Sequence, residues 1–116
     1  MSVPVLPGLT ALDPEQVAAI AWEPCDGWPG VEQKVLSRSP GLVLGLLRLA
    51  PGAREVPHLH GAGEHHVWVL EGQVRTPDAV LPSGSYVHVR PGTLHQLSDA
   101  GAGSTLLFAY RELGAL

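Results

Sequence analysis

Cysteine is nearly absent from this chain, since Cys25 is its single cysteine among 116 residues. One thiol cannot form an internal disulfide, and it excludes a zinc site built from a cluster of cysteines. Because no disulfide framework is possible, we expect a reducing, intracellular environment.

Charged side chains are also scarce, at 16% of the residues, and the net charge of −4 leaves no basic patch. Nucleic acids and anionic membranes are therefore not expected partners. Long hydrophobic runs are missing too, because no segment approaches the roughly 18 apolar residues of a membrane span. Residues 1–8 lack a basic region and are interrupted by proline, unlike a signal peptide. We expect a cytoplasmic protein without membrane segments.

What the chain does contain is 45% hydrophobic residues, with 14 glycines and 11 prolines spread along its length. This composition predicts an all-β domain of short strands and many turns. We predict an N-terminal arm with a short helix over residues 1–30 and a single β-domain over residues 31–116. Asp13 is the expected N-cap of that helix, with Pro14 at its first position and Gln16 completing a capping box. Pro24 is expected to end the helix, which would extend to Trp22.

Strand-like segments separated by turn residues follow one another from Val31 onward, which is typical of a sandwich or barrel. Ser39-Pro40-Gly41 is one such turn, and Glu71-Gly72 is another. The predicted strands cover residues 31–38, 42–50, 64–70, 73–76, 85–89 and 104–111.

Histidines are concentrated in one segment, because four of the six lie between positions 58 and 66. His58 and His60 have period-2 spacing, so an extended strand would place both on one face. His95 would join them from a later strand, and Glu64 would add a carboxylate oxygen. These donors suit a divalent transition metal. The alternative is a surface strand whose histidines make ordinary hydrogen bonds.

The fourth position of this set is open from spacing alone. Glu64 and His65 are neighbours on a predicted strand, so only one of them can face the metal. We favour Glu64 and keep His65 as the alternative. If Glu64 faces the metal, His66 shares its face and becomes a candidate general acid–base catalyst. A barrel-lining histidine without a catalytic role is an equal alternative for His66, and His88 is expected at the surface.

Two segments resemble the conserved motifs of the cupin superfamily. The first runs from Gly52 through the histidine segment to Gly72, and the second runs from Gly84 to His95. Because both motifs occur in the expected order, the resemblance is specific. It departs from the general pattern in two places. Six residues between the ligand and Gly72, as in the general pattern, would select His65 rather than Glu64, and Pro91 is shifted by one position behind Arg90.

The resemblance implies an antiparallel jelly-roll β-barrel that binds one metal ion, and it is greatest for small ChrR-like cupins. It implies His58, His60, Glu64 and His95 as metal ligands. The implied metal is iron or zinc, with manganese or nickel as alternatives.

Two functions compete on this basis. The first is a metal-dependent dioxygenase acting on a small oxygenated organic molecule, with His66 as the candidate catalytic residue. The second is a non-catalytic zinc-binding sensor or ligand-binding module of the ChrR type, and a purely structural metal is a third possibility. Arg48, Arg75 and Arg111 are candidate anchors for an anionic substrate. The apolar run Leu42–Leu49 predicts a homodimer.

Overall fold

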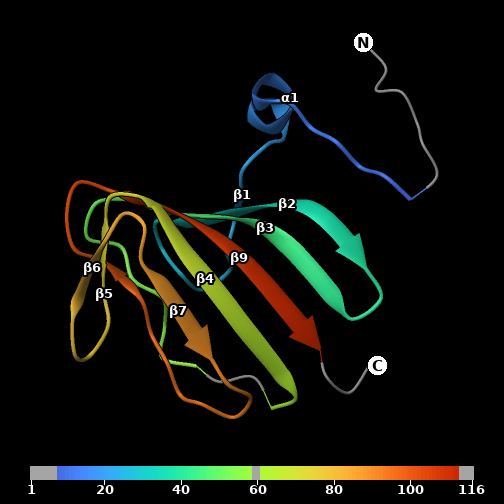
Figure 1. The fold of residues 1–116 in the computed structure, drawn as a ribbon. Helices are drawn as coiled ribbons and strands as arrows, with labels where there is room; N and C mark the ends of the chain where they lie inside the picture. The colour runs from blue at the N-terminus through green and yellow to red at the C-terminus, as the bar shows by residue number, and fades with distance from the viewer. Residues whose placement is uncertain (1–7, 59–60, 113–116) are drawn as a thin grey trace.

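The computed structural model describes residues 8–58 and 61–112, which form one helix and nine strands within those ranges. A six-stranded sheet has the order β1-β2-β3-β9-β4-β7, and a three-stranded sheet has the order β6-β5-β8 (Figure 1). The elements are α1 (Pro14–Ala19), β1 (Glu23–Pro24), β2 (Val31–Ser39), β3 (Leu42–Leu49), β4 (Gly63–Glu71), β5 (Gln73–Arg75), β6 (Val80–Pro82), β7 (Tyr86–Val89), β8 (Ser98–Asp99) and β9 (Ser104–Glu112).

The predicted all-β, antiparallel fold with one short helix is confirmed, because every strand pairing in the described ranges is antiparallel. The strands form two separate sheets and do not close into a complete barrel. One hydrophobic core nevertheless contains residues from both sheets. Its most deeply buried side chains are Val31, Leu49, Val69, Val74 and Leu106.

Helix α1 begins as the sequence predicts. The Asp13 carboxylate accepts a hydrogen bond from the Gln16 amide at 2.8 Å, and the Gln16 side chain accepts one from the Asp13 amide at 2.9 Å. The helix ends at Ala19, before the predicted end at Trp22, because Ile20 already has an extended backbone. Lys34 Nζ donates to the carbonyl of Val17 at 2.8 Å and so attaches this end of the helix to β2. No described residue of α1 is buried, and the helix stands off from the sheet (Figure 1).

Strand β2 contains a bulge that changes which side chains face the core. Its register on β3 shifts between Val35 and Ser37, so that Val35 pairs with Gly45 whereas Arg38 pairs with Val43. The extra residue reverses the alternation of side chains beyond it. Arg38 therefore shares the inner face with Val35, although the two residues are an odd number of positions apart.

Strand β4 presents two chemically different faces. Val67 and Val69 are buried at 5% and 1% exposure, whereas Trp68 and Leu70 are exposed at 37% and 45%. Because side chains alternate along a strand, His65 lies on the inner face with Val67. The other face, toward solvent, carries Glu64, His66 and Trp68.

Three strands were not predicted, and each has only two or three residues. Such short strands have no periodicity to detect. Within the described ranges, no helix is long and apolar enough to cross a membrane.

Candidate metal centre

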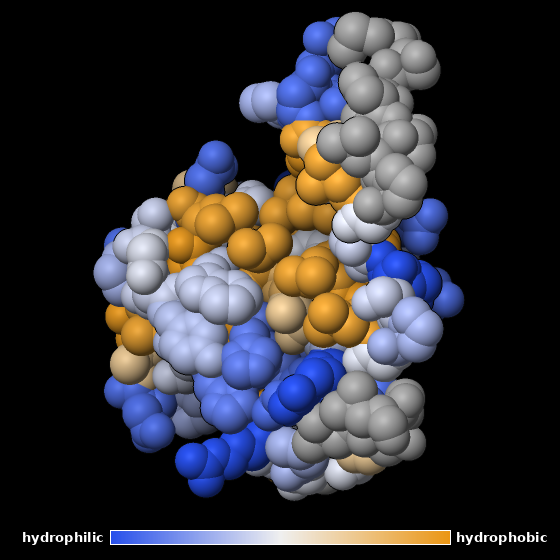
Figure 2. Space-filling view, turned by 45° about the vertical axis from the view of Figure 1, so that its right-hand side comes forward, coloured by the Kyte–Doolittle hydropathy of each residue, from blue (hydrophilic) through white to orange (hydrophobic). Residues whose placement is uncertain are grey.

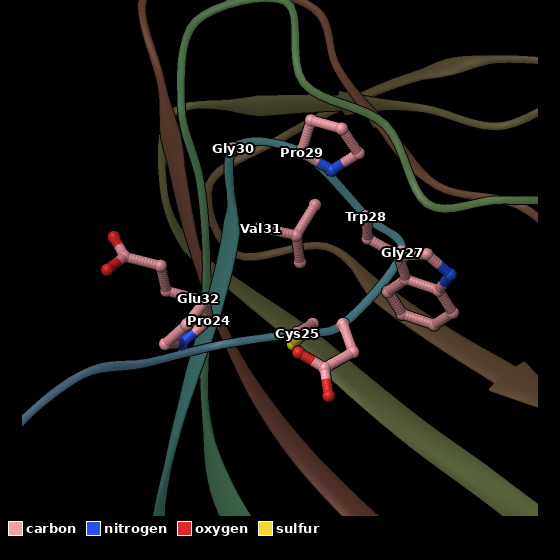
Figure 3. Close-up of a pocket in the computed structure, with 9 residues that line it drawn as sticks. Pro24, Cys25, Gly27, Trp28, Pro29, Gly30, Val31 and Glu32 are labelled. Carbon is pink, nitrogen blue, oxygen red and sulfur yellow. The ribbon is translucent and has the colours of Figure 1, made fainter.

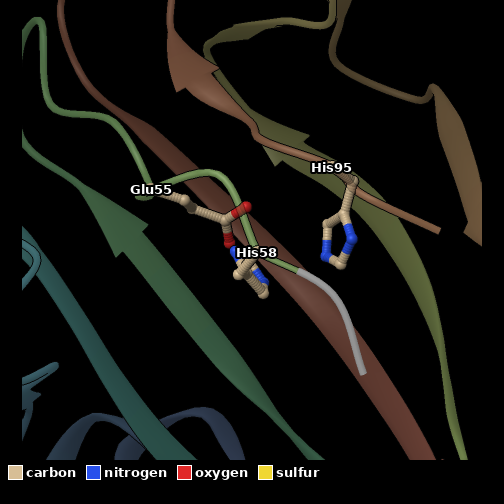
Figure 4. A group of neighbouring side chains, drawn as sticks. All are labelled: Glu55, His58 and His95. Carbon is tan, nitrogen blue, oxygen red and sulfur yellow. The ribbon is translucent and has the colours of Figure 1, made fainter. Parts of the chain in front are cut away.

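His58 and His95 lie side by side, as the sequence predicts. The two residues form an antiparallel bridge in which each backbone amide donates to the other's carbonyl, at 3.0 and 2.8 Å. Their ring centroids are 4.1 Å apart. The bridge connects the loop after β3 to the loop after β7, so the two motif segments meet here (Figure 4).

The tautomers of these two histidines suit metal binding. Nδ1 of His58 lies 2.7 Å from the Val56 carbonyl, and Nδ1 of His95 lies 2.9 Å from the Thr93 carbonyl. A carbonyl can only accept, so each Nδ1 carries a proton, and in the neutral form of each ring the lone pair is on Nε2. Both Nε2 atoms are buried. Burial also lowers the pKa of His95, which keeps its imidazole in the neutral form that binds metals.

Glu55, which was not predicted from the sequence, brings a carboxylate to the same place. Its ligand atom and those of His58 and His95 all lie within 4.8 Å of one another (Figure 4). Glu55 is only 6% exposed and accepts a hydrogen bond from the Leu97 amide at 3.1 Å. Burial raises its pKa, while the Leu97 amide and the nearby His58 act to lower it. Its position three residues before His58 is the one signal that could have indicated it.

His65 approaches the same group from β4. Its ring centroid is 5.9 Å from that of His95 and 4.8 Å from that of Tyr110, which lies on the neighbouring strand β9. The inner face of β4 therefore offers an imidazole where the sequence favoured the carboxylate of Glu64. His60, the remaining predicted histidine ligand, lies outside the described residues.

Glu64 and His66 are not brought to His58 and His95. Both side chains lie on the outer face of β4, because they alternate with His65 and Val67. Glu64 accepts hydrogen bonds there from Arg111, at 2.6 Å from Nη2, and lies 3.1 Å from Nε2 of His88. The bond to His88 and then those to Arg111 lower the pKa of the Glu64 carboxyl. The alternation along β4 is the one predicted, but the face that carries Glu64 is the outer one, because Val67 and Val69 on the other face fill the core.

A cavity of about 380 Å³ lies against the inner face of the large sheet, next to His65 and Glu55. Most of its wall is apolar, and Val43, Leu47, Val67 and Phe108 contribute to it. The bulge in β2 adds the exposed side chain of Arg38 to this lining. Arg48 and Arg111, two of the predicted substrate anchors, instead pair with Glu32 and Glu64 on the outer face.

A second hollow lies beside the loop between β1 and β2 (Figure 3). Cys25 lies there, and burial raises the pKa of its thiol, with nearby carboxylates of Glu55, Asp26 and Glu32 adding to the effect. A raised pKa disfavours the thiolate, so Cys25 is poorly suited to be a nucleophile. Trp28 lies in the same loop and its ring is 4.7 Å from that of His58, centroid to centroid.

Comparison with known proteins supports the resemblance seen in the motifs. The family model of the ChrR Cupin-like domain matches residues 14–113. A chain of the complex of SigE with the anti-sigma ChrR from Rhodobacter sphaeroides is 23% identical with a TM-score of 0.68, over 78% of this chain and 49% of that chain. No curated protein sequence matches significantly.

Two further solved structures are similar to this chain. The polyketide cyclase RemF from Streptomyces resistomycificus is 18% identical with a TM-score of 0.76, over 89% of this chain and 79% of that chain. KdgF from a Halomonas species is 21% identical with a TM-score of 0.69, over 79% of this chain and 86% of that chain. At these identities the likeness shows a shared fold.

Proposed function

The chain belongs to the ChrR Cupin-like domain family, and from this premise we propose that it is a metal-dependent dioxygenase acting on a small oxygenated organic molecule. The observation that carries the proposal is the group formed by His58, His95 and the buried Glu55, whose ligand atoms lie within 4.8 Å of one another. Two histidines and one carboxylate with open positions are the ligand set of non-haem iron(II) oxygenases.

We propose His58, His95 and Glu55 as ligands. His65, whose ring centroid lies 5.9 Å from that of His95, is a further candidate donor, and His60 stays a candidate from the sequence alone. The Nδ1–H groups of His58 and His95 donate to backbone carbonyls, which orients the rings and directs both Nε2 lone pairs inward. A metal bound here would supply a Lewis acid and a site where dioxygen and substrate meet. Iron or zinc fits imidazole and carboxylate donors, and manganese or nickel would fit the same set.

The size and lining of the cavity beside His65 support the proposal that the substrate is a small organic molecule. Its volume of about 380 Å³ falls within the range of small-molecule pockets. Its apolar wall would exclude water from the carbon skeleton, and Arg38 would bind a carboxylate or enolate oxygen through its guanidinium. We therefore propose a substrate that combines a compact carbon skeleton with one anionic group.

A non-catalytic module is the second candidate function, because the matching family is described by ChrR and a similar structure is an anti-sigma complex. In that case the same residues would hold zinc, and the bound ion or a small ligand would control contact with a partner protein.

One experiment separates these functions. The protein is purified anaerobically, its metal content is measured by elemental analysis, and oxygen consumption is followed with a panel of small dicarbonyl compounds. We expect iron and substrate-dependent oxygen uptake that is lost in His95→Gln. Tightly held zinc without oxygen uptake on any compound would overturn the dioxygenase proposal and favour the sensor.

A further inference from the structure

A second group of metal-ligating side chains lies on the outer face of the large sheet. Glu64 and His66 come from β4, and His88 comes from β7. We propose that this group is a second binding site for a transition-metal dication such as Zn²⁺ or Cu²⁺, separate from the centre on the inner face. The proposal does not depend on the enzymatic activity proposed above.

The strand register places these three side chains together. His66 and His88 are direct cross-strand partners in the antiparallel pair of β4 and β7. Their rings are parallel within 4° and their centroids are 4.6 Å apart. Glu64 precedes His66 by two residues, so its side chain leaves the strand on the same face. Rigid backbone pairing thus sets the spacing of all three donors.

The donor atoms are close to the separation that a bound ion requires. Nε2 of His88 lies 3.1 Å from Oε2 of Glu64, and Nε2 of His66 lies 3.6 Å from Oε1. Ligands at about 2.0–2.1 Å from a zinc ion lie roughly 3–3.5 Å from one another. Small side-chain rotations would therefore bring the three donors to one ion, with the remaining positions taken by water.

Two neighbouring residues support the donors in the way that outer partners of metal sites do. The Tyr86 hydroxyl is hydrogen-bonded to Nδ1 of His66, which fixes the ring and leaves Nε2 directed toward Glu64. Arg111 binds Oε1 of Glu64 through Nε and Nη2, at 3.0 and 2.6 Å. The other oxygen, Oε2, is thereby presented to His88 and to an ion placed between them.

Arg111 also sets the strength of the site. Its positive charge opposes a second cation nearby, but its side chain is 47% exposed, so water reduces the repulsion. We therefore expect weaker binding than at a buried three-ligand centre. Copper(II) should bind more tightly than zinc, as imidazole donors generally prefer it.

The test is equilibrium dialysis of the full chain against Zn²⁺, with ions counted per chain. We expect two ions in the unchanged protein and one in His66→Gln or His88→Gln, whose affinity for the second ion falls at least about tenfold. Glu71→Gln, which removes an exposed carboxylate from the same strand, should keep two. His95→Gln should lose the inner ion and keep the outer one.

A direct measurement identifies the atoms involved. Side-chain nitrogen NMR should show the Nε2 resonances of His66 and His88 shifting as the second equivalent of Zn²⁺ is added, and Arg111→Gln should bind that equivalent more tightly. Binding of only one ion by the unchanged chain, retained in His66→Gln and His88→Gln but lost in His95→Gln, would show a plain surface ion-pair network on the outer face and overturn the proposal. Retention of the second ion in both histidine variants would overturn it as well.

Discussion

Adjacent residues of β4 serve opposite sides of one sheet. His65 faces the cavity beside His95, whereas Glu64 and His66 face solvent beside His88. Two neighbouring residues of a regular strand cannot face the same side, because a shift of one residue exchanges every side chain between faces. The metal-binding proposals therefore assign Glu64 and His65 to different ions.

Substitutions at His65, Glu55 and Glu64 distinguish which of these residues belongs to the inner centre. If the proposed inner centre binds iron, His65→Ala and Glu55→Gln should each lower its affinity for iron by at least about tenfold, because each removes a proposed donor or its charge. Glu64→Gln should leave that affinity unchanged, since its carboxylate lies on the outer face. The measurement is iron retained through gel filtration. Iron lost in Glu64→Gln and kept in His65→Ala would restore the ligand set preferred from the sequence.

Asp99 is a second residue with a specific role. Its Oδ2 accepts hydrogen bonds from the amides of Gly52, Gly101 and Gly103, at 3.0, 3.2 and 3.2 Å, and so joins two loops. Burial acts to raise the pKa of this carboxyl, but the hydrogen bonds outweigh it and the pKa is lowered. A lowered pKa in the folded state means that the ionised form stabilises the fold.

We expect Asp99→Asn to reduce the free energy of unfolding by about 1.5–3 kcal/mol at pH 7. The difference from the unchanged protein should be full above the unfolded pKa of about 3.9. It should shrink as the pH falls through the lower folded value, where Asp99 itself becomes neutral. Urea unfolding at several pH values measures this. A difference that stays constant down to strong acid would contradict the role of the charge.

At the scale of elements, the turn between β4 and β5 depends on a glycine. Gly72 has φ of +78°, and a Cβ there would lie 2.2 Å from the Gly103 carbonyl oxygen. Gly84 has a similar φ of +92°, but a Cβ there meets nothing within 4 Å. Comparing alanine substitutions at Gly72 and Gly84 therefore distinguishes the cost of a left-handed backbone from the cost of a steric clash.

Gly84→Ala should therefore cost about 1–2 kcal/mol of stability from the left-handed backbone alone. Gly72→Ala should cost more, because the loop carrying Gly103 must also move away from the new methyl group. Urea unfolding of the two variants gives the comparison. Equal losses would show that the approach of Gly103 does not constrain the turn.

Elements with a local sequence signal were predictable here, whereas the bulge in β2 and the orientation of β4 were not. The capping box of α1 and the β2–β3 turn have local signals and are present. The pairing of His58 with His95 was likewise predictable, because two recognisable motifs carry them. The bulge after Val35 has no such signal, and it alone places Arg38 on the cavity side. Which face of β4 turns inward is decided by Val67 and Val69, which fill the core, and the spacing of the histidine motif alone did not indicate it.

At the scale of the whole molecule, association of two copies stays a prediction. Leu44 and Leu46 of β3 are half-buried on the outer face, and Trp68 is 37% exposed on the same sheet. Figure 2 shows hydrophobic side chains gathered beneath the helix. We expect a homodimer, and light scattering at micromolar concentration should give twice the mass of 12.2 kDa. A mass of one chain at all concentrations would contradict it.

The contact between Trp28 and His58 gives the molecule an optical reporter of its own. The two rings are 4.7 Å apart, centroid to centroid. Indole emission is sensitive to a protonated imidazole or a paramagnetic ion at such short range. Fluorescence lost in a Trp28→Phe variant would therefore isolate the signal of this one tryptophan. Occupancy of the inner centre could then be followed in real time without a label.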